Sequence, residues 1–436
     1  MFRSLRTYNY RLWAMGAVVS NIGTWMQRIA QDWLVLTQLT HNSGAALGVV
    51  TALQFAPPLL LLPLTGWAAD RIDRRKLLFA TQAASAVLAL GLGVITLLNV
   101  VQLWHVYAFA LALGVVSAFD APARQTFVSE LVDEVNLSNA VALNSTSFNA
   151  ARLIGPAAGG ILIAAVGTGW MFLINAASYG ATIAALLMLR QDELHRGDRA
   201  TAVRTGLADG FRYVWREPRL LTIMIMFFLI GTFGLNFAIF ISTMTVRVFG
   251  GGPHRLGLLT SMMAVGSVAG ALMSARRSRP SARALVWGAA AFGVACAVAA
   301  VMPQWWMFGI MLAVAGAASQ TFTTTANGVV QLSSEPALRG RVVAIMMALA
   351  MGGTPLGAPI TGWLADTLGP RWSLSMGAFA GFAATAVGVG YLIQHRGLRL
   401  SWRQGRPRLS MHPRHPATRD EVTEGEEAVK EAVLQP

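Results

Sequence analysis

The stretch Gly66-Trp-Ala-Ala-Asp70-Arg71-Ile-Asp73-Arg74-Arg75-Lys76 places two carboxylates and four basic residues at the end of a long apolar run, residues 44–69. Gly66 permits close helix packing, and the basic side chains would hold this helix end at a charged membrane surface. An aspartate at a helix end can face the positive N-terminal end of a neighbouring helix. A basic loop alone would only set orientation in a membrane, so Asp70, between the glycine and the basic run, is the informative residue.

The composition of the whole chain indicates an integral membrane protein. Of its 436 residues, 55% are apolar and only 12% are charged, about half the charged fraction of an ordinary soluble domain. With ~20 to 25 residues per membrane-spanning helix, this length has room for about a dozen spans and for little else. A water-soluble protein is therefore excluded.

Twelve apolar stretches predict twelve membrane-spanning helices in an all-α fold. The predicted organisation is an N-terminal six-helix bundle at 1–189, a cytoplasmic linker at 190–218, a C-terminal six-helix bundle at 219–395 and a tail at 396–436. The predicted spans are 12–37, 44–69, 77–98, 104–127, 138–166, 170–189, 219–246, 256–275, 284–302, 305–329, 342–367 and 371–394.

The linker and the tail differ from the bundles in their polar composition. In the linker, Val203, Leu207, Phe211 and Val214 recur at helical spacing among charges, which favours a helix lying on the membrane surface. An ordinary solvated linker fits the same composition. The tail has few large apolar residues and is expected to be disordered.

The basic residues predict the orientation of the chain. There are 34 Lys plus Arg against 20 Asp plus Glu, for a formal net charge of +14. Basic residues accumulate on the cytoplasmic side of bacterial membranes. With the N-terminus inside, only three of them fall in outer loops, Arg247, Arg255 and Arg371, and three lie within spans, Arg28, Arg124 and Arg152. We therefore expect a multi-pass protein of the bacterial inner (cytoplasmic) membrane with both termini cytoplasmic, and no binding of nucleic acid, because the charge does not gather on one soluble face.

The chain also contains an internal repeat. Sliding the sequence by 202 positions superimposes residues of the fourth to sixth spans on those of the tenth to twelfth without a gap. Duplicated helix sets of this kind imply two parallel halves. The matched pairs are Gly114 and Gly316, Ser117 and Ser319, Gly155 and Gly357, Gly160 and Gly362, Gly167 and Gly369, and Trp170 and Trp372.

A second motif, Arg152-Leu-Ile-Gly155-Pro156-Ala-Ala-Gly159-Gly160, lies within the fifth span. A Gly-Pro step bends a membrane helix, and the following glycine pair lets another helix backbone approach closely. We therefore expect this part of the fifth span to pack tightly against a neighbour.

These motifs resemble those of a known family. The loop at 66–76 closely resembles the cytoplasmic signature loop of the major facilitator superfamily, and Arg152–Gly160 resembles the fifth-span signature of its antiporters. The stretches 20–28 and 120–124 are similar to the branch of enterobactin exporters and macrolide-efflux-type proteins, the transmembrane secretion effectors. The resemblance covers residues 1 to about 395.

The resemblance implies a fold and a function. The fold would be two pseudo-symmetric six-helix bundles. The function would be export of small amphipathic molecules, such as drugs, secondary metabolites or siderophores, by alternating access with proton antiport. The gating motif would then comprise Gly66, Asp70, Arg71, Asp73, Arg74, Arg75, Gly155 and Pro156.

The first span carries a polar stripe that lipid cannot face: Ser20, Asn21, Thr24, Gln27, Arg28, Gln31 and Asp32. Charges at that depth cost several kcal/mol unless they pair or meet water. Arg28 and Asp32, one turn apart, are therefore candidates for a cavity wall, with Arg152 as the expected partner of Asp32. We expect Asp32 to carry the proton, although a purely structural ion pair remains an alternative.

Other spans supply further candidates. Polar side chains that could line a substrate cavity are Gln54, Asn175, Tyr179, Asn236, Gln320, Thr324 and Asn327. Asp120 and Arg124, one turn apart near the cytoplasmic end of the fourth span, could form a gate or an ordinary helix-end pair.

Other functional classes are less compatible with the sequence. A membrane enzyme would need clustered catalytic or metal-binding groups, but the histidines are scattered and Cys296 is the sole cysteine. Direct use of ATP is excluded because the sequence has no Gly-x-x-x-x-Gly-Lys loop. We expect a monomer with no metal or cofactor, whose partners are a small-molecule substrate, protons and the lipid bilayer. An importer or uniporter of a metabolite remains the nearest alternative, ahead of a passive channel.

Overall fold

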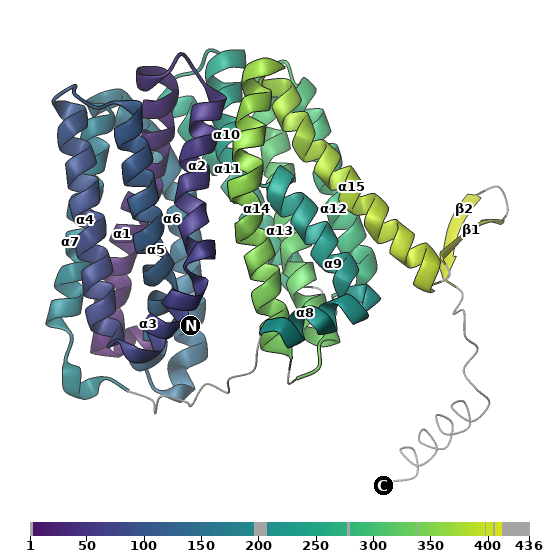
Figure 1. Ribbon diagram of the computed structural model, residues 1–436, viewed down its shortest axis with the longest axis horizontal. Coiled ribbons are helices and arrows are strands. Elements are labelled where there is room, and N and C mark those ends of the chain that lie inside the picture. Colours follow the sequence, from purple (N-terminus) through teal and green to yellow (C-terminus); the bar gives the residue numbers. More distant parts are fainter. Residues whose placement is uncertain are drawn as a thin grey trace, which may run out of the picture.

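The computed structural model describes residues 3–195, 207–276, 280–336, 338–396, 398–403 and 406–411, and this part of the chain is almost entirely helical (Figure 1). The first group of long helices is α1 (Tyr8–Trp33), α2 (Gly44–Leu60), α3 (Leu62–Arg71), α4 (Arg74–Leu97), α5 (Leu103–Phe127), α6 (Glu134–Val166) and α7 (Thr168–Met188). The second group is α8 (Leu207–Arg216), α9 (Pro218–Leu229), α10 (Phe237–Thr243), α11 (Pro253–Ala275), α12 (Ala282–Val301), α13 (Trp305–Ser333), α14 (Arg339–Thr367) and α15 (Pro370–Arg396).

Short turns and one hairpin complete the described elements. Tight helical turns are η1 (Arg3–Arg6), η3 (Val128–Glu130) and η4 (Gln191–Glu193), and wider π-helical turns are η2 (Leu34–Leu39), η5 (Ile230–Gly234) and η6 (Met244–Val248). The strands β1 (Leu398–Arg403) and β2 (Arg406–Met411) pair antiparallel, with Leu398 opposite Met411.

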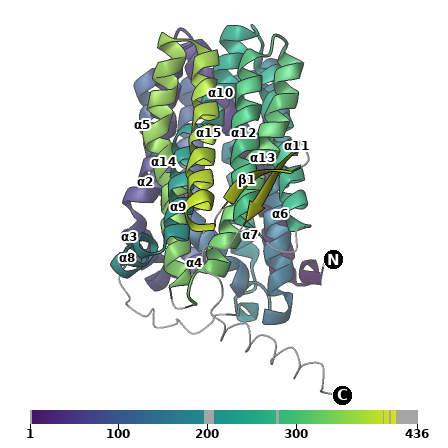
Figure 2. The same cartoon turned by 90° about the vertical axis from the view of Figure 1, so that its right-hand side faces the viewer.

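The two groups of helices stand side by side, and most of their long helices run along the same direction (Figures 1 and 2). Every predicted apolar span coincides with one helix or with a helix that is broken once. The second span breaks at Leu61, where Pro57 and Pro58 inside α2 and Pro63 at the start of α3 remove backbone donors. The seventh breaks at Leu235 and Asn236, between η5 and α10.

Ten helical stretches within the described residues are long and apolar enough to cross a membrane. The apolar helix α2 has 17 residues because it ends at the break, and α1 has 26 residues but carries the polar stripe. Many large apolar side chains are exposed along the helices. Among the exposed tryptophans of the described residues, Trp215 and Trp287 lie toward one side, and the others lie near helix ends on the opposite side: Trp104, Trp170, Trp306, Trp363 and Trp372. This is the arrangement expected of helices in lipid with an aromatic belt at the interface.

One glycine pair of the internal repeat, Gly114 and Gly316, makes similar contacts in the two groups of helices. A Cβ on Gly114 would meet the carbonyl oxygens of Leu53 and Gln54 in α2, and a Cβ on its counterpart Gly316 would meet Met263 and Ser267 in α11. The two glycines therefore allow equivalent close contacts in the two halves.

The halves meet through two helix pairs, α2 with α14 and α6 with α11. A Cβ on Gly48 would overlap the carbonyl oxygen of Ala358, and a Cβ on Gly257 would overlap that of Pro156. The expectation that the Gly155-Pro156 segment packs tightly is thus confirmed, and its neighbour across the halves is α11.

The linker contains a helix, as predicted from the spacing of its apolar residues, although residues 196–206 lie outside the described part. Gly210 of α8 packs against Arg341 of α14, while Phe211 and Trp215 are exposed. The tail was expected to be disordered, yet its described part forms the β1–β2 hairpin, which reflects the alternation of Leu398, Leu400 and Trp402 before Gly405.

Candidate functional site

A cavity of about 390 Å³ lies between the two halves. It is lined from the first half by the last turns of α1 and the middle parts of α2 and α6. From the second half it is lined by Leu235 and Asn236 at the break in the seventh span and by α10, α11, α13 and α14. Six sequence-predicted residues line it: Arg28, Asp32, Gln54, Arg152, Asn236 and Gln320. Its size falls in the range of small-molecule sites, roughly 300 to 1,000 Å³.

Two arginine side chains that line this cavity lie over the ring of Trp25. The guanidinium carbon of Arg28 lies 4.8 Å from the centroid of the Trp25 ring, and that of Arg152 lies 6.0 Å from it. Arg28 also approaches the ring of Phe55, at 5.8 Å. Both cations therefore have favourable contacts with aromatic rings. Trp25 lies within the stretch 20–28 but was not predicted as a site residue, because an aromatic residue in a membrane helix usually serves packing.

Gly155 makes room for this arrangement. A Cβ at position 155 would press on the Cβ of Trp25 in α1. Gly155 lies one turn after Arg152 on α6, so the same turn supplies the cation and the space for the ring beside it. The motif in the fifth span thus positions Trp25 as well as the contact with α11.

The charged groups of the cavity do not neutralise one another. Within the described part of the chain, Asp32 forms no ion pair within 4.0 Å with Arg28 or Arg152, and none of the three side chains forms a hydrogen bond. The expected contact between Asp32 and Arg152 is not made. All three side chains line the cavity.

Several other predicted cavity residues instead hold α1 against α7. Asn175 Nδ2 donates to Gln27 Oε1 at 2.5 Å, and the hydroxyl groups of Tyr179 and Thr24 lie 3.3 Å apart. Gln31 is also buried away from the cavity lining. The polar stripe of α1 is thus wider than the part of α1 that lines the cavity. Some of its side chains face the cavity, and the others pack against α7.

In the second half, Asn236 is held at the break in the seventh span. Its Nδ2 donates to the carbonyl oxygen of Thr232 at 2.7 Å and to Thr361 Oγ1 at 3.2 Å, while its Oδ1 is buried with no partner among the described residues. Gln320 Nε2 lies 3.4 Å from Thr324 Oγ1. Thr324 and Asn327 do not line the cavity.

Asp120 and Arg124 form a pair inside the first half. Arg124 Nε donates to Asp120 Oδ2 at 3.0 Å, and Thr81 and Gln82 of α4 both donate to Asp120 Oδ1 at 2.7 Å. Because these partners all come from α4 and α5, the geometry favours the structural helix-end pair over a gate between halves.

The loop at 66–76 makes its described contacts within the first half. Asp73 caps α4 by accepting from the backbone N–H of Lys76 at 3.0 Å. Arg74 forms an ion pair with Glu130 at 2.7 Å, and Arg75 Nε donates to the carbonyl oxygen of Leu186 at 2.8 Å. The side chain of Asp70 lies outside what the structure describes.

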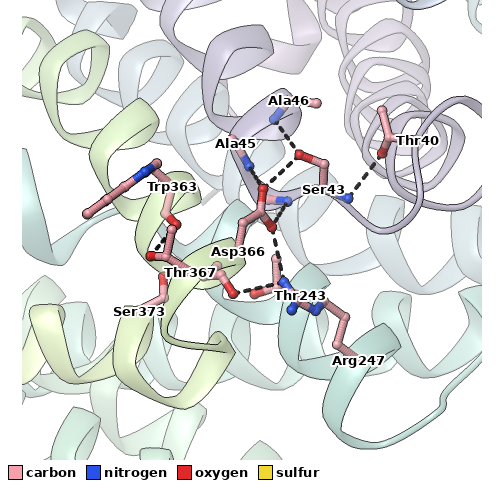
Figure 3. Close-up of polar contacts among 12 residues, drawn as sticks. Thr40, Ser43, Ala45, Ala46, Thr243, Arg247, Trp363, Asp366, Thr367 and Ser373 are labelled. Atoms are coloured by element: carbon pink, nitrogen blue, oxygen red, sulfur yellow. Dashed lines mark hydrogen bonds and ion pairs between the residues drawn. The ribbon is translucent and has the colours of Figure 1, made fainter.

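A second charged site lies at the opposite end of α2, where α14 ends (Figure 3). Asp366 of α14 accepts hydrogen bonds from the backbone N–H groups of Gly44 and Ala45 and from Ser43 Oγ, at 2.7, 2.9 and 2.8 Å. Arg247 of η6 donates to Asp366 Oδ1 at 3.0 Å. We call this set, Ser43, Gly44, Ala45, Arg247 and Asp366, the α2–α14 clasp.

The clasp was missed in the sequence although a signal was present. The segment Gly362-Trp-Leu-Ala-Asp366 repeats the pattern Gly66-Trp-Ala-Ala-Asp70. The two aspartates fall at opposite ends of the adjacent helices α14 and α2–α3. The two segments are not separated by the 202 positions of the internal repeat. Comparing the two halves of the sequence at that offset therefore does not align them.

A family model described as transmembrane secretion effector matches residues 2–399. The chain belongs to this family. The chain is 29% identical over 367 residues to the multidrug efflux pump Tap of Mycolicibacterium fortuitum, covering 81% of this chain and 88% of that protein. It is 26% identical to the enterobactin exporter EntS of Citrobacter koseri, covering 81% of this chain and 84% of that protein.

The fold also matches solved transporter structures. An inward-facing, occupied structure of a bacterial homologue of the human lysosomal transporter Spinster superimposes with a TM-score of 0.68 at 16% identity, covering 89% of this chain and 97% of the other. The predicted superfamily and branch are thus confirmed. This transmembrane secretion effector is a multi-pass membrane transporter of small molecules and not an enzyme.

Proposed function

We propose that this transmembrane secretion effector exports small amphipathic molecules from the bacterial cytoplasm in exchange for protons, by alternating access. The observation that carries the proposal is the cavity between the halves, which is lined by Arg28 and Asp32 from the last turns of α1 and by Arg152 from the middle of α6. Charged groups at this depth mark solute or ion pathways in membrane proteins. Relatives whose names denote efflux and export support the outward direction.

The proposed topology has twelve spans in two six-helix bundles. We take α1 and the broken helix α2–α3 as the two spans that complete the ten apolar ones. The distribution of basic residues supports cytoplasmic termini in the inner membrane of a bacterium. A single chain encloses the cavity from both halves, which supports a monomer.

Alternating access requires contacts that close each side in turn. In the proposed topology the α2–α14 clasp lies at the outer end of the halves, where it holds the outside closed. A Cβ built on Gly66, at the other end of the α2–α3 segment, has no neighbour within 4 Å. We propose that Asp70 supplies the reciprocal contact when the cytoplasmic side closes, by facing the N-terminal end of α14.

Asp32 is the proposed proton-exchanging group. Apolar surroundings favour the neutral form of a carboxyl group, and a nearby guanidinium favours the charged form, so a carboxylate among both can change protonation as its surroundings change. Arginine stays protonated throughout. Of the three charged groups in the cavity, only Asp32 can therefore carry the proton.

The test is transport by the full chain in proteoliposomes, with and without a pH gradient. Rhodamine 123, rhodamine 110, fluorescein, erythromycin and a catecholate siderophore serve as candidate cargoes. In the inside-out population we expect uptake of at least one compound when the lumen is acidic, and loss of that uptake with a protonophore. Uptake only under the reversed gradient would indicate an importer, and downhill movement insensitive to the gradient would indicate a uniporter.

A further inference from the structure

The cavity presents charges of both signs that remain apart. Arg28 and Asp32 are spaced by one helical turn on α1, where such residues commonly pair. Instead, the Arg28 guanidinium turns back over Trp25, at 4.8 Å, and towards Phe55, at 5.8 Å. Arg152 reaches the same tryptophan from α6, at 6.0 Å. The aromatic contacts therefore hold two cations on one wall and leave Asp32 unpaired within the described part of the chain.

Separated charges in a membrane protein are costly unless water or a ligand satisfies them. Arg28, Asp32 and Arg152 all line the cavity, so a ligand in that space can contact each of these side chains. Two planar guanidinium groups suit a carboxylate or a similar anion. The Asp32 carboxylate suits a cation or a strong hydrogen-bond donor, and the Trp25 ring offers a face for a flat apolar body.

We infer that the cargo is an amphipathic zwitterion, with an anionic group bound by Arg28 and Arg152 and a cationic group bound by Asp32. This inference rests on the proposed function, since it names the cargo of the same cavity. The chemical class is a molecule with a flat aromatic body whose acidic and basic groups are separated by a few ångströms or more.

The sign of proton coupling supports a zwitterion over a simple ion. A cation alone would be repelled by two guanidinium groups. An anion alone would bind better when Asp32 is protonated, so by reciprocal linkage it would move together with the proton. The cationic group of a zwitterion competes with the proton for Asp32 while its anionic group uses the arginines. Only this class combines binding to the arginines with exchange against protons.

Three dyes that share one three-ring scaffold test the inference. Rhodamine 110 is a zwitterion, rhodamine 123 is its cationic methyl ester, and fluorescein is an anion. Binding of each dye to the full chain in lipid nanodiscs is measured by fluorescence anisotropy at neutral pH. We expect rhodamine 110 to bind about 10-fold or more tightly than the other two, the effect of one charged hydrogen-bonded contact.

Two variants then separate the contacts. Arg152→Gln should weaken the binding of rhodamine 110 about 10-fold and leave the binding of rhodamine 123 unchanged or slightly tighter. Arg152→Lys should retain part of the preference for rhodamine 110 over rhodamine 123. Asp32→Asn should weaken the binding of rhodamine 110 and strengthen the binding of fluorescein. Arg212→Gln, on the exposed face of α8, is the matched control and should change none of the three affinities.

The outcomes distinguish this inference from the proposed function. The inference is overturned if the wild-type chain binds rhodamine 110 no more tightly than the other two dyes, or if it binds none of the three. This outcome is measured on the wild-type chain, so it does not depend on the folding of a variant. If rhodamine 123 is exported while rhodamine 110 is neither bound nor moved, proton-driven export stands and the zwitterion is wrong. If rhodamine 110 is bound with the predicted variant pattern but is not transported, the site is as inferred and the proposed function is wrong.

Discussion

The carboxylate of Asp366 accepts a hydrogen bond from the backbone N–H of Gly44 at 2.7 Å, although the two residues belong to different halves of the molecule. Gly44 is the first residue of α2, so the carboxylate caps the N-terminus of a helix from across the interface. Side-chain exposures of 29% for Arg247 and 27% for Asp366 show that their ion pair is partly solvated. The backbone hydrogen bonds are therefore the stronger part of the clasp.

We predict that Asp366→Asn weakens closure at the end where α2 begins. Loss of a charged cap costs about 0.5 to 2 kcal/mol, which would shift the balance of open and closed states by about 2- to 30-fold. Labelling of a cysteine at Thr323 by an impermeant maleimide from outside should rise by this order, in a Cys296→Ser background. Asp192→Asn, on the exposed turn η4, is the control. Unchanged labelling of the Asp366 variant would show that the clasp does not hold the outer side closed.

Asp70→Asn should have the opposite effect. If Asp70 faces the N-terminal end of α14 when the cytoplasmic side is closed, its neutral variant should spend more time open to the cytoplasm. Labelling of the same cysteine from outside should fall, while expression stays nearly intact. Wild-type labelling together with wild-type transport would mean that the loop only sets membrane orientation.

The topology makes a separate prediction. Reporter fusions after Arg199 and after Gly251 should report opposite sides of the membrane, with Arg199 cytoplasmic. Fusion after Gln191 serves as a second cytoplasmic position. Cytoplasmic signals at both Arg199 and Gly251 would contradict the twelve-span topology.

Gly155→Val should disrupt the cavity without replacing any charged residue. The added side chain would displace Trp25 and with it the platform for Arg28 and Arg152, so binding of rhodamine 110 should fall by about 10-fold, with a core-overpacking cost of ~1 to 3 kcal/mol in stability. Gly180→Val is the matched control, because a Cβ on Gly180 meets nothing within 4 Å. Equal effects of both variants on binding would show that the loss of binding comes from a change in helix propensity and not from displacement of Trp25.

The helices and the charged cavity residues were predictable from the sequence for a simple physical reason. A charge such as Asp32 or Arg152 in an apolar run stands out because lipid cannot solvate it. Whether a neutral polar side chain faces a cavity or a neighbouring helix depends on the rotation of each helix, which periodicity does not specify. Gln54 and Gln27 therefore looked alike, although only Gln54 lines the cavity. Trp25 and the clasp required contacts between distant segments.

Asp32→Asn tests whether Asp32 exchanges protons during transport. The full chain carrying this variant is reconstituted, and counterflow of rhodamine 110 and its pH-driven accumulation are measured in the same proteoliposomes, with Asp32→Glu as the conservative control and detergent-extracted yield as the measure of folding. We predict normal yield, retained though weaker counterflow and loss of pH-driven accumulation in Asp32→Asn, with accumulation largely restored in Asp32→Glu. Undiminished pH-driven accumulation in Asp32→Asn would show that Asp32 does not carry the exchanged proton, and a collapse in yield in Asp32→Asn would assign Asp32 to a structural role instead.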